Sequence, residues 1–179
     1  MRVVLASASP RRAELLRAAG FDFEVRPSGL TEWPFAGGDP ADHAEALAHA
    51  KAAGADGAVV VGADTIVVLD GEVLGKPGGP AAAAAMLRRL SGRTHEVVTG
   101  VAVRRGSALR SGTARAEVTF RELSEREICD YIAGGEPLDK AGAYAYQGAA
   151  GAFVVRLDGD ADTVIGMPIA LLERLLAQL

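Results

Sequence analysis

The first twenty residues constrain the fold most, because a short apolar run passes directly into a capped helix. Residues 2–6 carry the uninterrupted run VVLA, which predicts a buried strand. Ser9 then stands at an N-cap position, Pro10 follows at the favoured first helical position, and Gly20 ends the helical pattern. A buried strand must be covered by other elements, so this segment indicates a sheet with helices on its faces.

Two arginines occupy an unusual place in this segment. Arg11 and Arg12 lie on the first turn of the predicted helix, where the N-terminal end of the helix dipole is already positive. Two cations are unfavourable there unless an anion lies beside them, and Ser7 and Ser9 bring two hydroxyls to the same place. We interpret the segment as an anion-binding site. A solvated helix face is the alternative explanation for the arginines alone.

The rest of the chain alternates strand and helix patterns. Helices are expected over about residues 40–53, 80–90, 124–134 and from Pro168 onward, and strands over 21–27, 95–104, 113–121 (joined to the preceding strand by a turn near Gly106 and Gly112) and 151–157. The apolar stretch before the second of these helices is expected to break at residues 62–65 into two strands, with a hairpin turn at Asp70-Gly71. The sum predicts an α/β or α+β domain on a mixed, twisted sheet flanked by helices, without indicating the strand order.

Composition excludes several classes of protein. Hydrophobic residues make up 49% of the 179 residues and charged ones 23%, a balance typical of a soluble globular domain. The formal net charge of −4 argues against a general nucleic-acid surface. Cys129 is the only cysteine, so an intrachain disulfide is excluded, and we expect this side chain in the core. Without a signal peptide or a membrane span, the chain is expected to be cytoplasmic.

Three catalytic motifs are approached and not matched. The segment GEVLGKP is one residue short of a phosphate-binding loop, and Pro77 stands where a metal-binding Ser or Thr is needed. In HEVVT, Thr99 occupies the position of the second zinc-binding His, which leaves His95 as an ordinary strand residue. The sequence contains no G-x-S-x-G elbow. Serine-hydrolase, zincin and P-loop chemistry are therefore not indicated.

Four groups of polar residues interrupt segments that are otherwise apolar or loop-like. They are Ser7, Ser9, Arg11 and Arg12; Glu32 in the loop over 28–38; Asp64 and Thr65; and Asp139, Lys140 and Gln147, to which Lys51 and Lys76 add two cations. Asp64 alone is also typical of a turn after Gly62. A buried acid is costly, however, unless it is paired or binds a ligand. Together the groups offer carboxylates for a divalent cation and cations for a polyphosphate, which is the equipment of phosphoryl chemistry.

Five segments resemble the Maf proteins, nucleoside triphosphate pyrophosphatases once described as septum-formation inhibitors. They are LASASPRR, GADTIVVLDGEVLGKP, LSGRTHEVVTGVAV, GEPLDKAGAYAYQG and TVIGMPIALL. They follow the family's order and cover essentially the whole chain. The resemblance implies one domain over residues 1–179, with the mixed α/β fold of the inosine-triphosphate pyrophosphatases and a nucleotide cleft between two lobes. It also implies a homodimer and a role in house-cleaning of nucleotide pools.

Three positions resemble the family branch that acts on dTTP and UTP. The branch that acts on 7-methyl-GTP has Trp, Gln and Glu at the places of Arg11, Thr65 and Gln147. A carboxylate suits a positively charged methylated guanine, whereas a neutral amide can both donate and accept, as the uracil edge requires. Two features depart from the branch: Tyr146 replaces an aliphatic residue, and residues 158–166 replace a Gly-Ser-Tyr stretch.

The resemblance implies hydrolysis of a pyrimidine nucleoside triphosphate to the monophosphate and pyrophosphate, assisted by Mg²⁺ or Mn²⁺. The implied roles are Asp64 as general base, Glu32 as metal ligand with Asp64 sharing that duty, Arg11, Arg12, Lys51 and Lys76 as phosphate contacts, and Ser7 and Ser9 as hydroxyl or backbone contacts. A non-catalytic nucleotide-binding regulator of septum formation is one alternative, and the 7-methyl-GTP branch is another.

Overall fold

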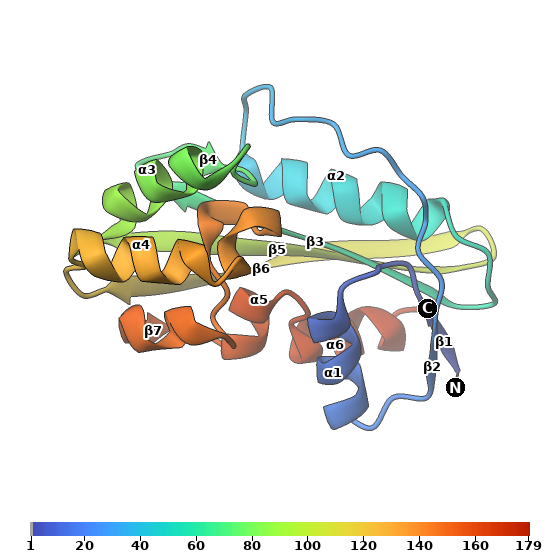
Figure 1. The fold of residues 1–179 in the computed structure, drawn as a ribbon. Coiled ribbons are helices and arrows are strands. Elements are labelled where there is room, and N and C mark those ends of the chain that lie inside the picture. The colour runs from blue at the N-terminus through green and yellow to red at the C-terminus, as the bar shows by residue number, and fades with distance from the viewer. Residues whose placement is uncertain (1) are drawn as a thin grey trace. The chain divides into compact units, whose positions relative to one another are not determined.

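A computed structural model describes residues 2–179, in which a seven-stranded mixed sheet is combined with six α-helices (Figure 1). The strands are β1 Val3–Leu5, β2 Phe23–Val25, β3 Val60–Leu69, β4 Glu72–Leu74, β5 Thr94–Arg105, β6 Ala108–Phe120 and β7 Val154–Asp158. Their order is β2-β1-β3-β5-β6-β7, with β4 paired to β3. The predicted class, a mixed sheet flanked by helices, is confirmed.

Helices cover about a third of the described chain, and none of those within residues 2–179 has the length and apolar character needed to cross a membrane. The α-helices are α1 Pro10–Ala18, α2 Pro40–Ala53, α3 Pro80–Leu90, α4 Glu125–Ala133, α5 Ala161–Ile165 and α6 Ile169–Ala177, and the 3-10 helices are η1 Glu136–Asp139, η2 Ala141–Ala143 and η3 Ala149–Phe153. The helices expected over 40–53 and 80–90 are confirmed. A capping box formed by Ser124 and Glu127 begins α4.

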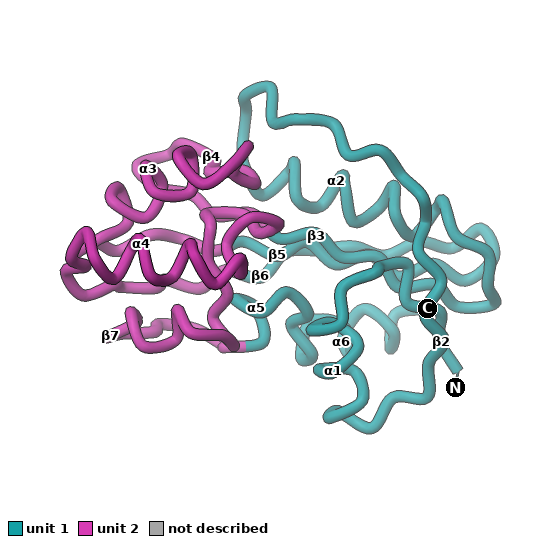
Figure 2. The backbone as a smooth tube through the Cα atoms, in the orientation of Figure 1, with its two compact units in different colours: residues 1–65, 98–114, 162–179 teal, residues 66–97, 115–161 magenta. Residues whose placement is uncertain are grey.

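The chain forms two compact units (Figure 2). Unit 1 contains the described residues up to Thr65, together with 98–114 and 162–179, and unit 2 contains residues 66–97 and 115–161. In unit 1, β1 pairs in parallel with β2 and with β3. β1 and β3 are buried on both faces, as their uninterrupted apolar runs predict, whereas β2 is partly exposed.

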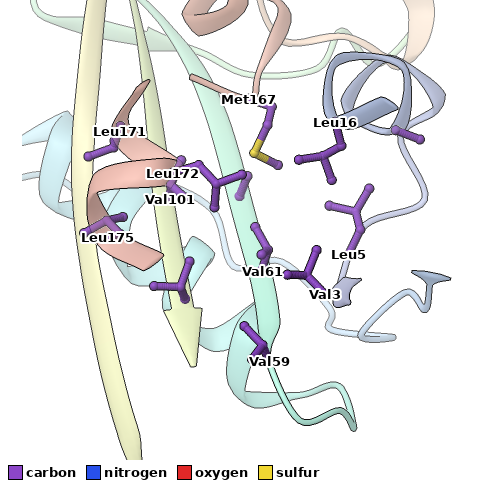
Figure 3. Close-up of a cluster of buried hydrophobic side chains, with 13 residues drawn as sticks. Val3, Leu5, Leu16, Val59, Val61, Val101, Met167, Leu171, Leu172 and Leu175 are labelled. Atoms are coloured by element: carbon purple, nitrogen blue, oxygen red, sulfur yellow. The ribbon is translucent and has the colours of Figure 1, made fainter. Parts of the chain in front are cut away.

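Alternate residues of the unit 1 strands enter two separate cores. Val3, Leu5 and Val61 pack with Leu16 of α1 and with Leu171 and Leu172 of α6, and Figure 3 shows these side chains pointing toward one another. Their neighbours Val4, Ala6 and Val60 pack on the opposite face, against Ala48 and Ala52 of α2. The helix α2 therefore covers one face of these strands, and α1 and α6 cover the other (Figure 1).

The expected break at residues 62–65 is wrong, because β3 continues through them. Gly62 is used for close packing rather than for a turn. A Cβ atom at this position would collide with the carbonyl oxygen of Ala48 and would lie 2.6 Å from the backbone nitrogen of Ala52, both in α2. The glycine therefore lets the helix approach the strand closely.

Unit 2 contains the hairpin and the loop over residues 136–153. The predicted turn at Asp70-Gly71 joins β3 to β4, with φ angles of 53° and 79°. Tyr144 follows the 3-10 helix η2, and its hydroxyl lies 2.8 Å from Nε2 of His95, a fully buried residue. Burial lowers the pKa of His95 to about 4, so this ring is neutral near pH 7.

Several expected boundaries are corrected. The hairpin between β5 and β6 turns at Gly106 alone, where φ is +58°, and Gly112 lies inside β6. The strand expected over 151–157 begins only at Val154, because η3 precedes it, and the strand expected over 21–27 is limited to residues 23–25. The short helix α5 was not expected. Cys129 is exposed rather than buried, since α4 turns Ile128 and Tyr131 toward the core instead.

The close contact at Gly62 can be tested by adding one methyl group. We expect Gly62→Ala to lower the free energy of unfolding by about 1–3 kcal/mol, because the methyl overpacks the contact with α2. Gly78→Ala is the matched control, since a Cβ there meets nothing within 4 Å. Urea unfolding measures both variants. Equal stability of the two variants would contradict close packing as the reason for Gly62.

Candidate active site

A buried ion pair lies at the centre of one of two clusters of polar residues in unit 1. Lys51 is in the last turn of α2, where the helix dipole favours a cation. Its Nζ donates to Asp64 Oδ1 of β3 at 2.7 Å and forms an ion pair with Glu32 Oε1 at 2.6 Å. Lys51 is 7% exposed and Asp64 6%, whereas the Glu32 side chain is 39% exposed. The structure thus brings together three of the predicted site residues, here called the lysine cluster.

The ammonium of Lys51 has all three of its N–H donors engaged, because it also reaches the carbonyl oxygen of Ala63 at 3.4 Å. Its predicted contact with phosphates therefore stays a prediction, since the structure directs this cation at carboxylates. Within residues 2–179, Asp64 Oδ2 accepts no hydrogen bond. The ion pair orients one oxygen of Asp64 and leaves the other available.

The other cluster in unit 1 surrounds Arg12 and is here called the arginine cluster. The Arg12 guanidinium donates to the carbonyl oxygen of Gly166 at 2.8 Å, to Ser7 Oγ at 3.0 Å and to Thr65 Oγ1 at 3.2 Å. Burial lowers the pKa of Arg12, and the carboxylates of Asp64 and Glu32 act in the opposite direction. Arg12 thus joins the end of β1, the middle of β3 and the residue before Met167, and two of its five N–H donors remain for other partners.

Arg11 and Ser9 lie beside this cluster. Arg11 is half-buried and makes no hydrogen bond or ion pair within the described residues 2–179. Ser9 occupies the N-cap position of α1, but in the part of the chain that is described its hydroxyl accepts no capping hydrogen bond. Its backbone N–H donates instead to Ser7 Oγ at 3.2 Å. The first turn of α1 consequently presents a guanidinium and a hydroxyl that form no hydrogen bond with any of residues 2–179.

The lysine and arginine clusters lie on opposite faces of β3. Successive side chains of a strand alternate in direction. Gly62 and Asp64 face α2, which carries Lys51, whereas Thr65 faces α1, which carries Arg12. The sequence suggests a single set of site residues, because it predicts a turn at residues 62–65, where the continuous strand instead directs neighbouring side chains to different faces.

Thr99 and Thr163 are buried threonines that extend the arginine cluster, and neither was predicted as a site residue. Thr65 Oγ1 lies 2.9 Å from Thr99 Oγ1 of β5, and Thr99 Oγ1 donates to the carbonyl oxygen of Thr163 at 2.7 Å. Thr99 and Thr163 are 0% and 1% exposed. The sequence does carry a signal for Thr99, since it is a polar residue inside the apolar run VVTGVAV.

Unit 2 holds the remaining predicted residues. Lys76 follows β4 and is exposed, and Gln147 is exposed between η2 and η3. Lys140 donates to Asp139 Oδ1 at 2.5 Å and to the carbonyl oxygen of Glu136 at 2.8 Å. Within unit 2, the segment that carries Gln147 is anchored on one side by the buried Tyr144. The predicted roles of Lys76 and Gln147 stay predictions.

The acids of the lysine cluster match only a metal ion that is completed by other ligands. No group of three or more potential ligands from His, Cys, Asp and Glu occurs among residues 2–179. Glu32 and Asp64 reach the same ammonium and thus supply two neighbouring carboxylates. Mg²⁺ is commonly held by one or two carboxylates, water and substrate phosphates, so this donor set fits such an ion.

Comparison with known proteins identifies the family. The model of the Maf-like protein family matches residues 2–179. The chain belongs to this family. Among its Maf-like relatives, a protein of Moorella thermoacetica is 52% identical over 98% of the chain and 94% of its own length, and one of Citrifermentans bemidjiense is 49% identical over 93% and 90%. A third, of Geobacter sulfurreducens, is 50% identical over 94% and 91%. All three are named dTTP/UTP pyrophosphatase.

The buried pair of this Maf-like chain can be tested by removing its cation. We expect Lys51→Met to lower the free energy of unfolding by about 3–5 kcal/mol, because it leaves the carboxylate of Asp64 buried without a counter-charge. The double variant Lys51→Met with Asp64→Asn should recover part of this loss, since it removes the isolated charge. Urea unfolding at pH 7 measures both variants.

Arg88→Met is the control for this test, because it breaks an exposed ion pair with Glu125 and should leave stability essentially unchanged. If Lys51→Met were as stable as Arg88→Met, the lysine cluster would have to be solvated rather than buried.

Proposed function

We propose that this protein hydrolyses dTTP and UTP to the nucleoside monophosphate and pyrophosphate. The observation that carries the proposal is the buried Lys51–Asp64 pair, which holds one carboxylate oxygen and leaves the other without a hydrogen bond from residues 2–179. Three relatives at 49–52% identity are named dTTP/UTP pyrophosphatase, which supports the same activity. The fold and family membership agree with the expectation from the sequence.

In the proposed mechanism, Asp64 acts as the general base. Lys51 orients the carboxylate through Oδ1, and Oδ2 accepts a proton from the water that attacks the triphosphate. The bond between the α- and β-phosphates breaks, and pyrophosphate leaves. Glu32 and Asp64 would hold a Mg²⁺ or Mn²⁺ ion. When bound, such an ion supplies charge neutralisation and polarisation of the phosphate oxygens.

Contacts with the phosphates are assigned to the first turn of α1. Arg11 has a guanidinium without a protein partner in the described residues, and Arg12 keeps two N–H donors after its three hydrogen bonds. Ser7 and Ser9 would add hydroxyl or backbone contacts, and Lys76 would add a further cation. An anion there also removes the conflict between these cations and the helix dipole.

Recognition of the nucleobase of the substrate is assigned to Thr65 and Gln147. Uracil and thymine present an acceptor, a donor and an acceptor along the pairing edge, and an amide can match two neighbouring groups of that pattern. We further propose that the whole chain acts as one functional domain and as a homodimer in the cytoplasm, that it cleans nucleotide pools, and that it binds neither nucleic acid nor membranes.

The role of Asp64 is tested by Asp64→Asn. Loss of a general base typically lowers a rate about 10²- to 10⁴-fold, so kcat should fall by that factor while the fold is retained. Pyrophosphate release from dTTP and UTP with Mg²⁺ or Mn²⁺ measures the effect. Asp130→Asn, on the exposed face of α4, is the matched control. A fall of less than about tenfold would move the role of general base to Glu32.

A wild type that binds nucleotide without turnover would favour the alternative function, a regulator of septum formation.

The assignment of nucleobase recognition to Gln147 is tested by Gln147→Glu. A carboxylate only accepts hydrogen bonds, so it would repel the O4 oxygen of uracil or thymine and leave a polar group without its partner. We expect kcat/KM for dTTP and UTP to fall by about 5- to 150-fold. Gln178→Glu, at the exposed end of α6, is the control. If the wild type preferred 7-methyl-GTP in a panel of nucleotides, the assignment to the dTTP/UTP branch would be wrong.

A further inference from the structure

Thr99 is a buried polar residue that the proposed mechanism does not use. It lies in β5, it is 0% exposed, and its Oγ1 has two oxygen neighbours. These are the carbonyl oxygen of Thr163 at 2.7 Å and Thr65 Oγ1 at 2.9 Å. All of these residues belong to unit 1. A buried hydroxyl with short contacts to two oxygens has a fixed pattern of donors and acceptors.

The direction of each hydrogen bond follows from counting protons. A carbonyl oxygen can only accept, so the single proton of the Thr99 hydroxyl points to Thr163. Thr99 Oγ1 must then accept from Thr65, whose own single proton is used in that bond. Arg12 can only donate, so Thr65 Oγ1 accepts from its guanidinium. The chain therefore runs from Arg12 through Thr65 and Thr99 to the Thr163 carbonyl, and the charge at its start polarises it.

This direction decides what Thr65 can offer a ligand. Its proton is committed to Thr99 and one lone pair is committed to Arg12, so one lone pair remains. The neighbouring Gly166 leaves that oxygen uncovered, because a Cβ at Gly166 would lie 2.8 Å from Thr65 Oγ1. Thr65 is accordingly a pure acceptor toward anything that binds beside it.

We propose that Thr99 is a positioning residue that keeps the Thr65 hydroxyl an acceptor and so makes the site favour pyrimidine bases that carry a hydrogen at ring nitrogen N3. This inference rests on the proposed function and deepens it. Uracil and thymine carry a hydrogen at N3, whereas cytosine presents a bare N3 acceptor. A site that offers only an acceptor discriminates against a ligand that offers another acceptor.

The test compares UTP with CTP in a pyrophosphate-release assay of the full chain. Thr99→Val keeps the shape of the side chain but cannot accept from Thr65, whose hydroxyl is then free to rotate and donate. We expect the ratio of kcat/KM for UTP to that for CTP to fall by about 5- to 150-fold, the range for one polar group left without its hydrogen-bond partner. Thr99→Ser restores the hydroxyl and should keep the ratio within about threefold of the wild type, because the hydrogen bonds are retained.

Thr94→Val is the matched control, since Thr94 lies on the same strand and pairs with the hydroxyl of Thr119 at 2.8 Å, outside the arginine cluster. Its ratio should equal that of the wild type. A folded Thr99→Val with the wild-type ratio would overturn the proposal, and so would a Thr99→Ser variant as altered as Thr99→Val. These outcomes differ from failure of the proposed function, in which the wild type itself would release no pyrophosphate from dTTP or UTP.

Discussion

The burial of β3 on both faces is the constraint on which the site of unit 1 depends. The part of β3 in unit 1 is covered by α2 on one side and by α1 and α6 on the other, so its side chains are buried except for Thr65, which is partly buried. The two polar residues within it must therefore find partners inside the protein. Asp64 finds a lysine on one face, and Thr65 finds an arginine and a threonine on the other. Polar groups so placed are costly unless they are paired, which explains why each of the two residues has a charged partner within hydrogen-bond distance.

The charged groups on the two faces of β3 are balanced in different ways. On the α2 face, a buried ammonium is balanced by two carboxylates, of which only Glu32 is substantially exposed. Breaking such a pair is far more destabilising than never having built it, so the arrangement contributes orientation more than stability. On the α1 face, the charge of Arg12 is dispersed into a carbonyl oxygen and hydroxyls. Carboxylates with their ammonium thus lie on one side of the strand, and a guanidinium with hydroxyl groups lies on the other.

Much of the fold could be predicted from the sequence, and the failures have physical causes. The ends of α2 and α3 are set by local signals, an Asp-Pro or Gly-Pro start and a nearby glycine, and these do not depend on tertiary contacts. Gly62 misled because a glycine in a strand marks either a break or a close approach, and only the position of α2 decides which. The residues of the lysine cluster were predicted, but their pairing was not, because the loop that carries Glu32 has no periodicity. Thr99 was missed because a threonine is also an ordinary strand residue.

The two arginines at the start of α1 look alike in the sequence but have different surroundings in the structure. Two cations on the positive end of a helix dipole appear equally unfavourable in the sequence. In the structure, Arg12 turns back to the Gly166 carbonyl and to two hydroxyls, so its cost is met within unit 1. Arg11 has no such partner among residues 2–179. The need for an anion at this helix therefore falls on Arg11. Because Arg12 also begins the chain that fixes Thr65, the same pair of residues would join recognition of the phosphates to recognition of the base.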